Sequence, residues 1–198
     1  MSYASTIQKP NAYFDHLYHM THIDNLSSIL LYGLLPHGNV HQKTDISDRD
    51  VNKRRARNEP IYSKPIHSYV PFYFNPKNPM LYVRSNLSKH IVILQMNQEL
   101  LYAKGSLFTD GNASCDSTSF YSNPSNLKEL DWTCLRAKGN YLGFNDGKRK
   151  RMAECLVPNK VSAVNIEKIL VNSFETKQKV DTITRKMIPC CVDTNYFF

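Results

Sequence analysis

Long hydrophobic runs are missing from this sequence of 198 residues. No segment approaches the roughly 18 consecutive apolar residues that a membrane-spanning helix needs, and the first residues lack the apolar centre of a secretion signal. We therefore predict a soluble, cytoplasmic protein with no membrane partner. The length suits one ordinary domain with a hydrophobic core, so we expect a single domain over residues 1–198 with a flexible lead-in at about 1–12.

The five cysteines form no recognisable framework. None are spaced as C-x-x-C, and Cys190 and Cys191 are adjacent, which is a poor arrangement for a disulfide between them. An odd number of cysteines without such spacing favours reduced thiols.

Several motifs of nucleotide and metal chemistry are also absent. The sequence contains neither a G-x-x-x-x-G-K-[ST] P-loop nor a G-x-G-x-x-G dinucleotide fingerprint. It contains no H-E-x-x-H, no G-x-S-x-G and no Asp/Glu cluster of the two-metal nuclease type. His19 and His22 are three residues apart, but on a strand that spacing sends the two rings to opposite faces. We therefore predict chemistry without a metal.

Positive charge is in excess. There are 25 Lys and Arg residues against 17 Asp and Glu, which gives a formal net charge of +8. This balance suits a polyanionic partner, and nucleic acid is the first candidate. A generic basic surface remains the alternative.

The apolar periodicity predicts an α+β fold with mixed sheets. Residues 17–22 read as a strand, and the helix that follows has Asp24 as its N-cap and ends near Gly33, where a glycine permits a left-handed turn. Residues 137–151 read as a mobile basic loop. The other expected strands lie at 69–74, 91–94, 152–157, 168–171 and 186–192, and the other expected helical segments at 50–57, 97–103, 117–121, 126–132 and 177–182.

Glu154 lies in an otherwise apolar strand directly after the basic run 148–151. Side chains alternate along a strand, so Met152, Glu154 and Leu156 share one face and the opposite face is apolar as well. Such a strand is central, and its carboxylate points into the protein or a cleft. A buried carboxylate is costly unless it is paired or used. A structural ion pair and a catalytic group at the mouth of a basic channel both fit this pattern.

Arginines and histidines supply the remaining polar candidates. On a helix, Arg54 and Arg57 fall on one side and Arg55 points elsewhere, so we expect Arg55 to face inward while its neighbours face solvent or a phosphate backbone. His19 and Thr21 share one face of the first strand. An ordinary hydrogen-bonded histidine is the alternative for both His19 and His22.

Taken in order, these segments resemble the DarT-type DNA ADP-ribosyltransferase toxins. No single segment is specific, but several of them occur in the same order over residues 17–171. The segments are YHMTHIDNL at 18–26 with IL at 29–30 and GL at 33–34, RR at 54–55, YVPFYF at 69–74, PMLY at 79–82, FTD at 108–110, LDW at 130–132 and RMAECLV at 151–157.

The resemblance implies an ADP-ribosyltransferase fold like that of poly-ADP-ribosyl polymerases, in which a split mixed β-sheet clasps NAD. It implies an enzyme that transfers ADP-ribose from NAD, as co-substrate, to a base in single-stranded DNA. It also implies a toxin–antitoxin system with a macrodomain antitoxin as partner. We expect the enzyme to be a monomer.

The resemblance also implies roles for individual residues. Glu154 and Arg55 correspond to the catalytic pair. The expected NAD-binding residues are His19, Thr21, Asn25, Arg55, Tyr73 and Tyr82. The expected DNA-binding residues are Thr109, Asp110, Asn112, Lys148, Arg149, Lys150 and Arg151.

The target base and some other functions stay open at this point. The residues from Asp110 to Ala113 differ from the thymine-modifying members, in which a bulkier residue and a histidine are common after the aspartate, so thymine and guanine are both candidates. A non-catalytic nucleic-acid-binding module, a metal-free toxin ribonuclease and an ADP-ribosyltransferase acting on protein or RNA are the alternative functions.

Overall fold

The computed structural model describes residues 13–47, 49–139 and 141–198. The lead-in predicted at 1–12 therefore lies outside the described residues. None of the helices in these ranges combines the length and the apolar character that crossing a membrane requires.

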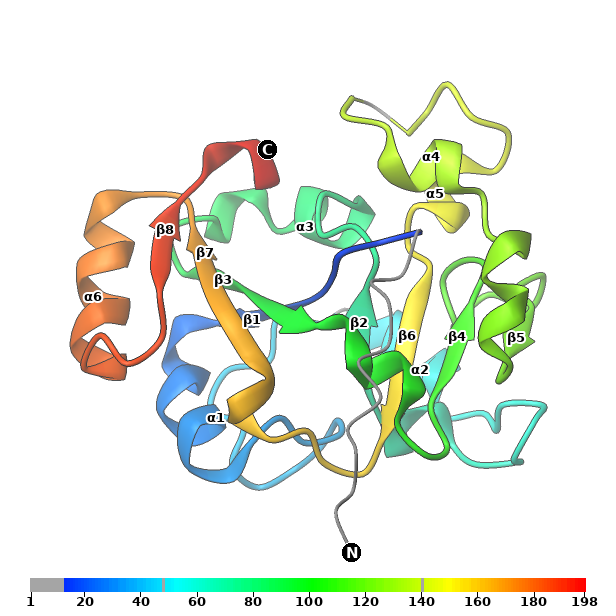
Figure 1. Cartoon of the computed structure of the whole chain (residues 1–198), viewed down its shortest axis with the longest axis horizontal. Helices are drawn as coiled ribbons and strands as arrows, with labels where there is room; N and C mark the ends of the chain where they lie inside the picture. Colours follow the sequence, from blue (N-terminus) through cyan, green and yellow to red (C-terminus); the bar gives the residue numbers. More distant parts are fainter. Residues whose placement is uncertain (1–12, 48, 140) are drawn as a thin grey trace, which may run out of the picture.

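One sheet runs through the centre of the molecule (Figure 1). Within the described residues it has eight strands in the order β5-β4-β6-β2-β1-β3-β7-β8. Neighbouring strands are antiparallel except for β7 and β8, so the sheet is mixed. The strands are β1 His16–His22, β2 Tyr69–Tyr73, β3 Ile91–Asn97, β4 Leu107–Thr109, β5 Phe120–Tyr121, β6 Glu154–Pro158, β7 Ile166–Val171 and β8 Cys190–Val192.

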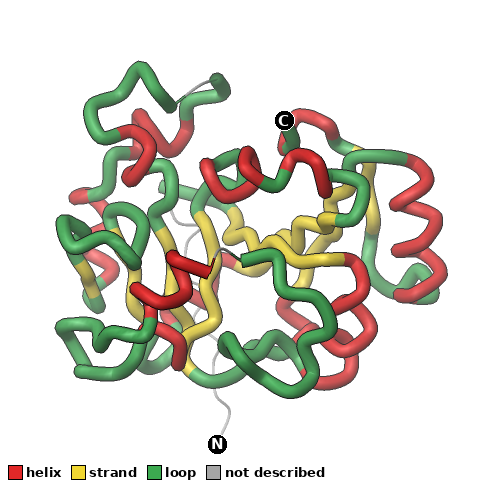
Figure 2. Tube along the Cα trace, turned by 180° about the vertical axis from the view of Figure 1, so that it is seen from behind, coloured by secondary structure: helices red, strands yellow, loops and turns green. Residues whose placement is uncertain are grey.

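Most helices are short and are joined by long loops around the strands (Figure 2). The predicted N-cap at Asp24 is wrong, because Asp24 lies inside a 3-10 turn, Ile23–Asn25, and Asn25 is the N-cap of α1. The predicted end at Gly33 is confirmed by its φ of +81°. The helices are α1 Leu26–Tyr32, α2 Arg49–Arg55, α3 Pro79–Val83, α4 Trp132–Arg136, α5 Gly147–Lys150 and α6 Phe174–Thr184.

The sheet is split between β1 and β2. Strand β1 pairs with β3 at seven positions, and β2 pairs with β6 at five. Between β1 and β2 the only registered pair in the described chain is Tyr18 with Tyr73, after which the strands diverge. Pro71 has no N–H and lies where β1 has already moved away, so no ladder bond to β1 is lost. The α+β class and the split mixed sheet are therefore confirmed.

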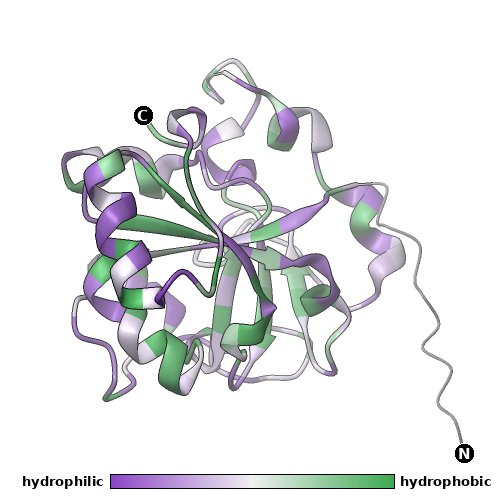
Figure 3. Cartoon of the chain, turned by 60° about the vertical axis from the view of Figure 1, so that its left-hand side comes forward, coloured by the Kyte–Doolittle hydropathy of each residue, from purple (hydrophilic) through white to green (hydrophobic). Residues whose placement is uncertain are grey.

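The main core lies between the sheet and the helices α1 and α6. Ala153, Cys155 and Val157 belong to it, whereas Leu156 packs in a separate cluster on the other face. The predicted alternation and the central position of the Glu154 strand are thus confirmed. Figure 3 shows hydrophobic segments along the inner strands, whereas the helices mix hydrophilic and hydrophobic residues.

Three local predictions were wrong. The end of the expected mobile loop is helix α5, and Met152 is not in β6, because the N–H groups of residues 151–153 bond back to the carbonyls of Gly147, Arg149 and Lys150. Residues 120–121 form a strand against β4 rather than a helical turn. The helical segment expected at 97–103 is confirmed, as a 3-10 helix over residues 98–102.

Arg151 holds the end of α4 against the start of β6. Arg151 is 1 % exposed, and its guanidinium group donates only to backbone oxygens. The expectation that Arg151 contacts DNA is therefore wrong, because the side chain is closed off from solvent and its donors are occupied. The accepting carbonyls are those of Lys77, Cys134, Leu135, Ala137 and Gly139.

We expect Arg151→Met to lower the free energy of unfolding by at least about 3 kcal/mol, because buried carbonyls lose their donors. Urea denaturation of the purified protein measures this change. Lys104→Met, at an exposed cation, is the control and should stay within about 0.5 kcal/mol of the unmodified chain. Equal stabilities for the two variants would contradict the stabilising role of Arg151.

Candidate active site

Glu154 is the first residue of β6 and has no exposed surface. Its backbone N–H donates to Thr109 Oγ1 over 3.0 Å, and Tyr73 lies opposite it in the β2–β6 register. Thr109 is itself buried and donates to the carbonyl of Gly111 over 2.6 Å. The strand end is therefore fixed by its neighbours on both sides.

Two donors from outside the sheet hold the Glu154 carboxylate. Arg55, at the end of α2, places Nη1 3.0 Å from Oε1 and 2.8 Å from Oε2. The backbone N–H of Ala113 donates to Oε1 over 3.0 Å. The prediction that Arg55 points inward is confirmed, since the residue is 9 % exposed. Glu154 and Arg55 therefore form a buried ion pair, as one interpretation of the sequence expected. Whether this pair also takes part in catalysis depends on what surrounds it.

A cavity of about 740 Å³ lies where the sheet splits. His19 and Thr21 line it from β1, Pro71 and Tyr73 line it from β2, and Arg55 lines it from α2. Its volume is within the range of small-molecule and cofactor sites. Glu154 lies directly behind Arg55 and Tyr73, so the buried carboxylate is next to a ligand-sized space.

His19 connects the two halves of the split sheet. Its Nδ1 lies 2.9 Å from the carbonyl oxygen of Pro71. A carbonyl only accepts, so Nδ1 carries the proton and Nε2 of the neutral ring is an acceptor. Burial lowers the pKa of His19, against the opposing effect of the Pro71 carbonyl. The ring therefore favours the neutral form, which can accept a hydrogen bond from a ligand hydroxyl group.

The Asn25 amide is fully engaged within the protein. Its Nδ2 donates to Thr21 Oγ1 over 3.0 Å and to the Thr44 carbonyl over 2.7 Å. Its Oδ1 accepts from the N–H groups of Lys43 and Thr44 over 2.8 and 2.9 Å. Asn25 and Thr21 line the cavity, but they serve first to tie the loop at 43–44 to the end of β1.

The two tyrosines expected at NAD lie in different environments. Tyr73 lines the cavity, and burial, with Glu154 nearby, raises the pKa of its hydroxyl well above the usual range. Tyr82 is outside the cavity lining, is 57 % exposed and packs edge-on against Phe198. The position of Tyr82 on the outer side of α3 is therefore inconsistent with packing against a ligand in this cavity.

The residues expected to contact DNA are divided by the structure. Asn112 lines the cavity, and its Oδ1 accepts from the Ser114 N–H, which leaves Nδ2 near the sulfur of Met152. Thr109 is buried beneath the loop as a support for Glu154. Asp110 is paired with Arg149. Of these three expected contacts, only the side chain of Asn112 is presented to the cavity.

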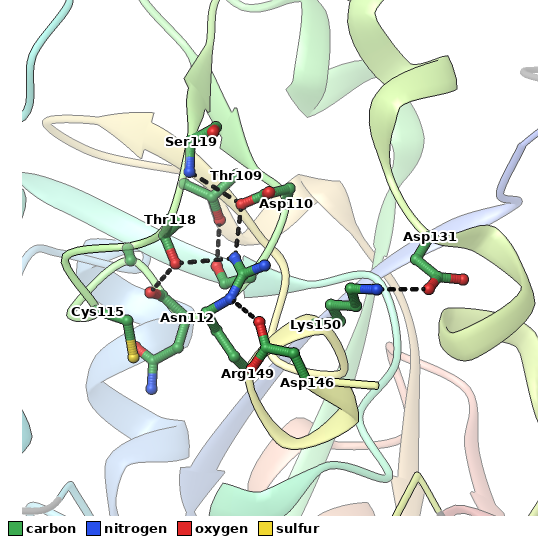
Figure 4. A network of polar contacts seen from close by, with 12 residues as sticks. Thr109, Asp110, Asn112, Cys115, Thr118, Ser119, Asp131, Asp146, Arg149 and Lys150 are labelled. Carbon is green, nitrogen blue, oxygen red and sulfur yellow. Dashed lines mark hydrogen bonds and ion pairs between the residues drawn. The ribbon is translucent and has the colours of Figure 1, made fainter. Parts of the chain in front are cut away.

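The basic segment is divided in the same way. Lys148 is exposed and lines the cavity. Arg149 also lines it but is ion-paired with Asp110 and Asp146. Lys150 forms an ion pair of 3.0 Å with Asp131 and is not among the residues that line the cavity (Figure 4). Of the four basic residues expected to contact DNA, Lys148 is therefore the one that is exposed beside the cavity.

Sequence reasoning missed two parts of the site. The loop from Leu35 to Ser47 forms one wall of the cavity, and its polar sequence carries no motif that marks a binding site. The Ala113 N–H is a backbone group, and residue type carries no signal for it. Among the described residues, no three His, Cys, Asp or Glu side chains form a group able to hold a metal, and the metal-free chemistry stays a prediction.

Comparison with known proteins identifies the relatives of this site. Residues 18–198 match the sequence model of the family described as "ssDNA thymidine ADP-ribosyltransferase, DarT". The chain belongs to the DarT family. It is therefore an enzyme of the DNA ADP-ribosyltransferase class.

Two curated relatives of the DarT family agree with this placement. A DNA ADP-ribosyl transferase of Thermus sp. (strain 2.9) is 31 % identical over 184 residues, which are 86 % of this chain and 87 % of that protein. A transferase–glycohydrolase fusion protein of Thermosipho africanus is 31 % identical over 194 residues, which are 93 % of this chain. The chain spans 50 % of the length of that fusion protein.

Solved DarT structures share the fold over nearly the whole chain. Thermus sp. 2.9 DarT in complex with ADP-ribosylated ssDNA superposes with a TM-score of 0.86 at 26 % identity, covering 97 % of this chain and 100 % of that one. The complex of the same protein with NAD+ gives a TM-score of 0.81 at 26 % identity, covering 96 % and 99 %.

We expect Arg55→Met to lower the free energy of unfolding by about 3 kcal/mol, because Glu154 then remains as an uncompensated buried charge. Adding Glu154→Gln removes that charge and keeps an acceptor for the Ala113 N–H, so the double variant should regain at least about 2 kcal/mol. Urea denaturation of the two variants and the parent measures both changes. An Arg55→Met protein as stable as the parent would exclude the ion pair.

Proposed function

We propose that this enzyme transfers ADP-ribose from NAD to a base in single-stranded DNA and releases nicotinamide. The observation that carries the proposal is the buried Glu154 carboxylate, held by Arg55 beside a cavity of about 740 Å³ at the split of the sheet. The relatives whose complexes contain NAD+ and ADP-ribosylated ssDNA support the same assignment.

Glu154 is the proposed catalytic carboxylate. When the bond between nicotinamide and ribose breaks, positive charge develops at the anomeric carbon. A fixed negative group beside that carbon stabilises the charge, and it does so strongly where water is excluded. Glu154 meets both conditions, because it is buried and held in place by Arg55 and Ala113. The same carboxylate is suited to accept the proton that a base nitrogen loses on attack.

Arg55 is the proposed partner of Glu154 at the reacting centre. A guanidinium group stays protonated at neutral pH, so Arg55 acts by charge and position rather than as a base. Its Nη1 contacts both carboxylate oxygens, and it lines the cavity. It therefore fixes the direction of Glu154 and is close enough to contact bound NAD.

The cavity walls suit the two ends of NAD. The Nε2 acceptor of His19 fits a ribose hydroxyl, and Tyr73 offers a ring surface near Glu154. Arg54 and Arg84 also line the cavity and supply positive charge for the pyrophosphate. Thr21 and Asn25 contribute by holding the wall at 43–44.

Asn112 is the proposed base-facing side chain. Its Oδ1 accepts from the Ser114 N–H and one Nδ2 hydrogen is directed at the Met152 sulfur, so the amide offers the second Nδ2 hydrogen as a donor at the cavity. A donor suits an acceptor oxygen such as thymine O4 or guanine O6, whereas adenine and cytosine carry an amine at the corresponding position. Thymine and guanine are thus the two proposed targets, and single-stranded DNA makes the unstacked base accessible at low cost.

We further propose that the enzyme is the toxin of a toxin–antitoxin system. The support is the Thermosipho africanus relative, in which a DNA ADP-ribosyl transferase is fused to a DNA ADP-ribosyl glycohydrolase. A glycohydrolase of the macrodomain type would remove the modification that this chain adds.

Incubation with labelled NAD and a set of single-stranded oligonucleotides, each lacking one base, tests the proposal. We expect label on every oligonucleotide except the one that lacks the target base, because a single base is modified. Mass spectrometry of the digested product identifies that base. Label transferred to protein or RNA alone, or RNA cleavage without NAD, would contradict the proposed reaction.

Glu154→Gln removes the charge at the reacting centre and preserves the shape of the side chain. We expect DNA modification to fall by at least about a thousandfold, as when an essential charge-stabilising group is lost, while calorimetry still detects NAD binding. Circular dichroism verifies the fold. Modification at a near-normal rate would remove Glu154 from the mechanism.

Lys148→Ala should weaken DNA binding and reduce its salt dependence. Each phosphate contact to single-stranded DNA contributes about 0.7 to the slope of log K against log salt concentration, so we expect a loss of about that size. Anisotropy of a labelled oligonucleotide at several salt concentrations measures the slope. Lys179→Ala, on α6, is the control with no expected change. An unaltered slope would mean that Lys148 does not contact a DNA phosphate.

A further inference from the structure

The loop from Asp110 to Thr118 carries the Ala113 N–H that contacts Glu154. This loop is polar apart from Ala113, which is buried in a small hydrophobic cluster with Leu107 and Leu156. Hydrogen bonds hold the rest of the loop, and several of them lead to one side chain on α5. That side chain is Arg149, which is 12 % exposed (Figure 4).

The side chain of Arg149 donates three hydrogen bonds, and its carbonyl accepts one from the loop. Nη1 donates to Asp110 Oδ1 over 2.8 Å and to Thr118 Oγ1 over 3.2 Å, and Nε donates to Asp146 Oδ2 over 2.5 Å. The carbonyl oxygen of Arg149 accepts from the Asn112 N–H over 3.1 Å. Arg149 thus contacts the loop at Asp110, Asn112 and Thr118.

The same loop segment leaves space for this guanidinium group. A Cβ atom at Gly111 would lie 2.4 Å from Nη1 and 2.8 Å from Cγ of Arg149. The loop is therefore shaped around the arginine, and a side chain at this position would have to displace it. Two carboxylates fix the arginine in place, so it has little freedom to yield.

Contacts inside the loop pass this position on to Ala113. Thr118 Oγ1 donates to the Asn112 carbonyl over 2.8 Å, and the Cys115 N–H donates to the same oxygen over 2.9 Å. Asn112 is thereby fixed at its N–H and its carbonyl, and the next backbone N–H along the chain is that of Ala113. On the far side, Arg57 donates to the carbonyls of Ala113 and Cys115 over 3.1 and 2.8 Å.

We propose that Arg149 is a positioning residue that holds the Ala113 N–H on Glu154 Oε1 and so fixes the carboxylate for the reaction. The proposal rests on the proposed function of Glu154. It replaces the expectation that Arg149 contacts DNA, because both Nη1 and Nε already donate to side chains of the protein.

Arg149→Ala tests the proposal through two independent readouts. We expect kcat for DNA modification to fall at least about tenfold with KM for NAD changed less than about twofold, since the group lost acts on the carboxylate and not on NAD. Hydrogen exchange measured by mass spectrometry should rise in the peptide that contains residues 110–118, because its amide hydrogen bonds open more often. Lys177→Ala, which removes the half-buried ion pair with Asp181 on α6, is the matched control and should change neither readout.

Arg149→Lys and Asp110→Asn are the second variants if Arg149→Ala does not fold. Lysine cannot reach Asp110 and Asp146 through two separate nitrogens, so it should restore less than half of the lost kcat. Asp110→Asn keeps the charge of Arg149 and weakens one anchor by removing its negative charge, so it should lower kcat and raise exchange in the same peptide. A double variant, Arg149→Ala with Asp110→Asn, should be no slower than Arg149→Ala alone.

Three results would overturn the proposal. The first is an Arg149→Ala protein with normal kcat and normal exchange at 110–118. The second is a loss confined to DNA affinity with a lower salt slope, which would make Arg149 a phosphate contact. The third is a double variant whose losses multiply. Failure of the proposed function is recognised separately, because the unmodified enzyme would then label no DNA while the exchange readout still reports on the loop.

Discussion

The site depends on keeping a negative charge out of water. Glu154 has no exposed surface, and a carboxylate in that position is stable only with strong partners. Arg55 and the Ala113 N–H provide them. The helix that carries Arg55 and the loop that carries Ala113 are far apart in the sequence, so this one carboxylate brings together α2, β6 and the loop after β4.

The split of the sheet gives that carboxylate access to a ligand. Strands β1 and β2 share one registered pair and then separate, which opens the cavity that Tyr73 and Arg55 line. His19 keeps the two halves connected through the Pro71 carbonyl. Continued pairing of β1 with β2 would close the gap between them and leave no room for a dinucleotide beside Glu154. The separation of β1 and β2 thus loses backbone hydrogen bonds between these strands and creates space for a ligand.

The cations near the site differ in their surroundings. Arg55 meets a carboxylate, Arg151 meets only carbonyl oxygens, and Lys148 remains exposed at the cavity. Arg149, one residue after Lys148, is enclosed by two carboxylates. Residues 148–151 look uniform in the sequence, yet each serves a different purpose. The count of 25 Lys and Arg residues thus overstates the number of cations available to a polyanion.

The sequence by itself determined the fold class, the central strand of Glu154, the end of α1 at Gly33 and the inward direction of Arg55, because apolar periodicity and helix geometry are local properties. Ordered motifs also indicated the family. The tertiary structure alone decided which donors reach Glu154, that Tyr82 lies outside the cavity and that Arg151 is buried. Those outcomes depend on contacts between distant segments, and on backbone groups such as the Ala113 N–H that no residue type reveals.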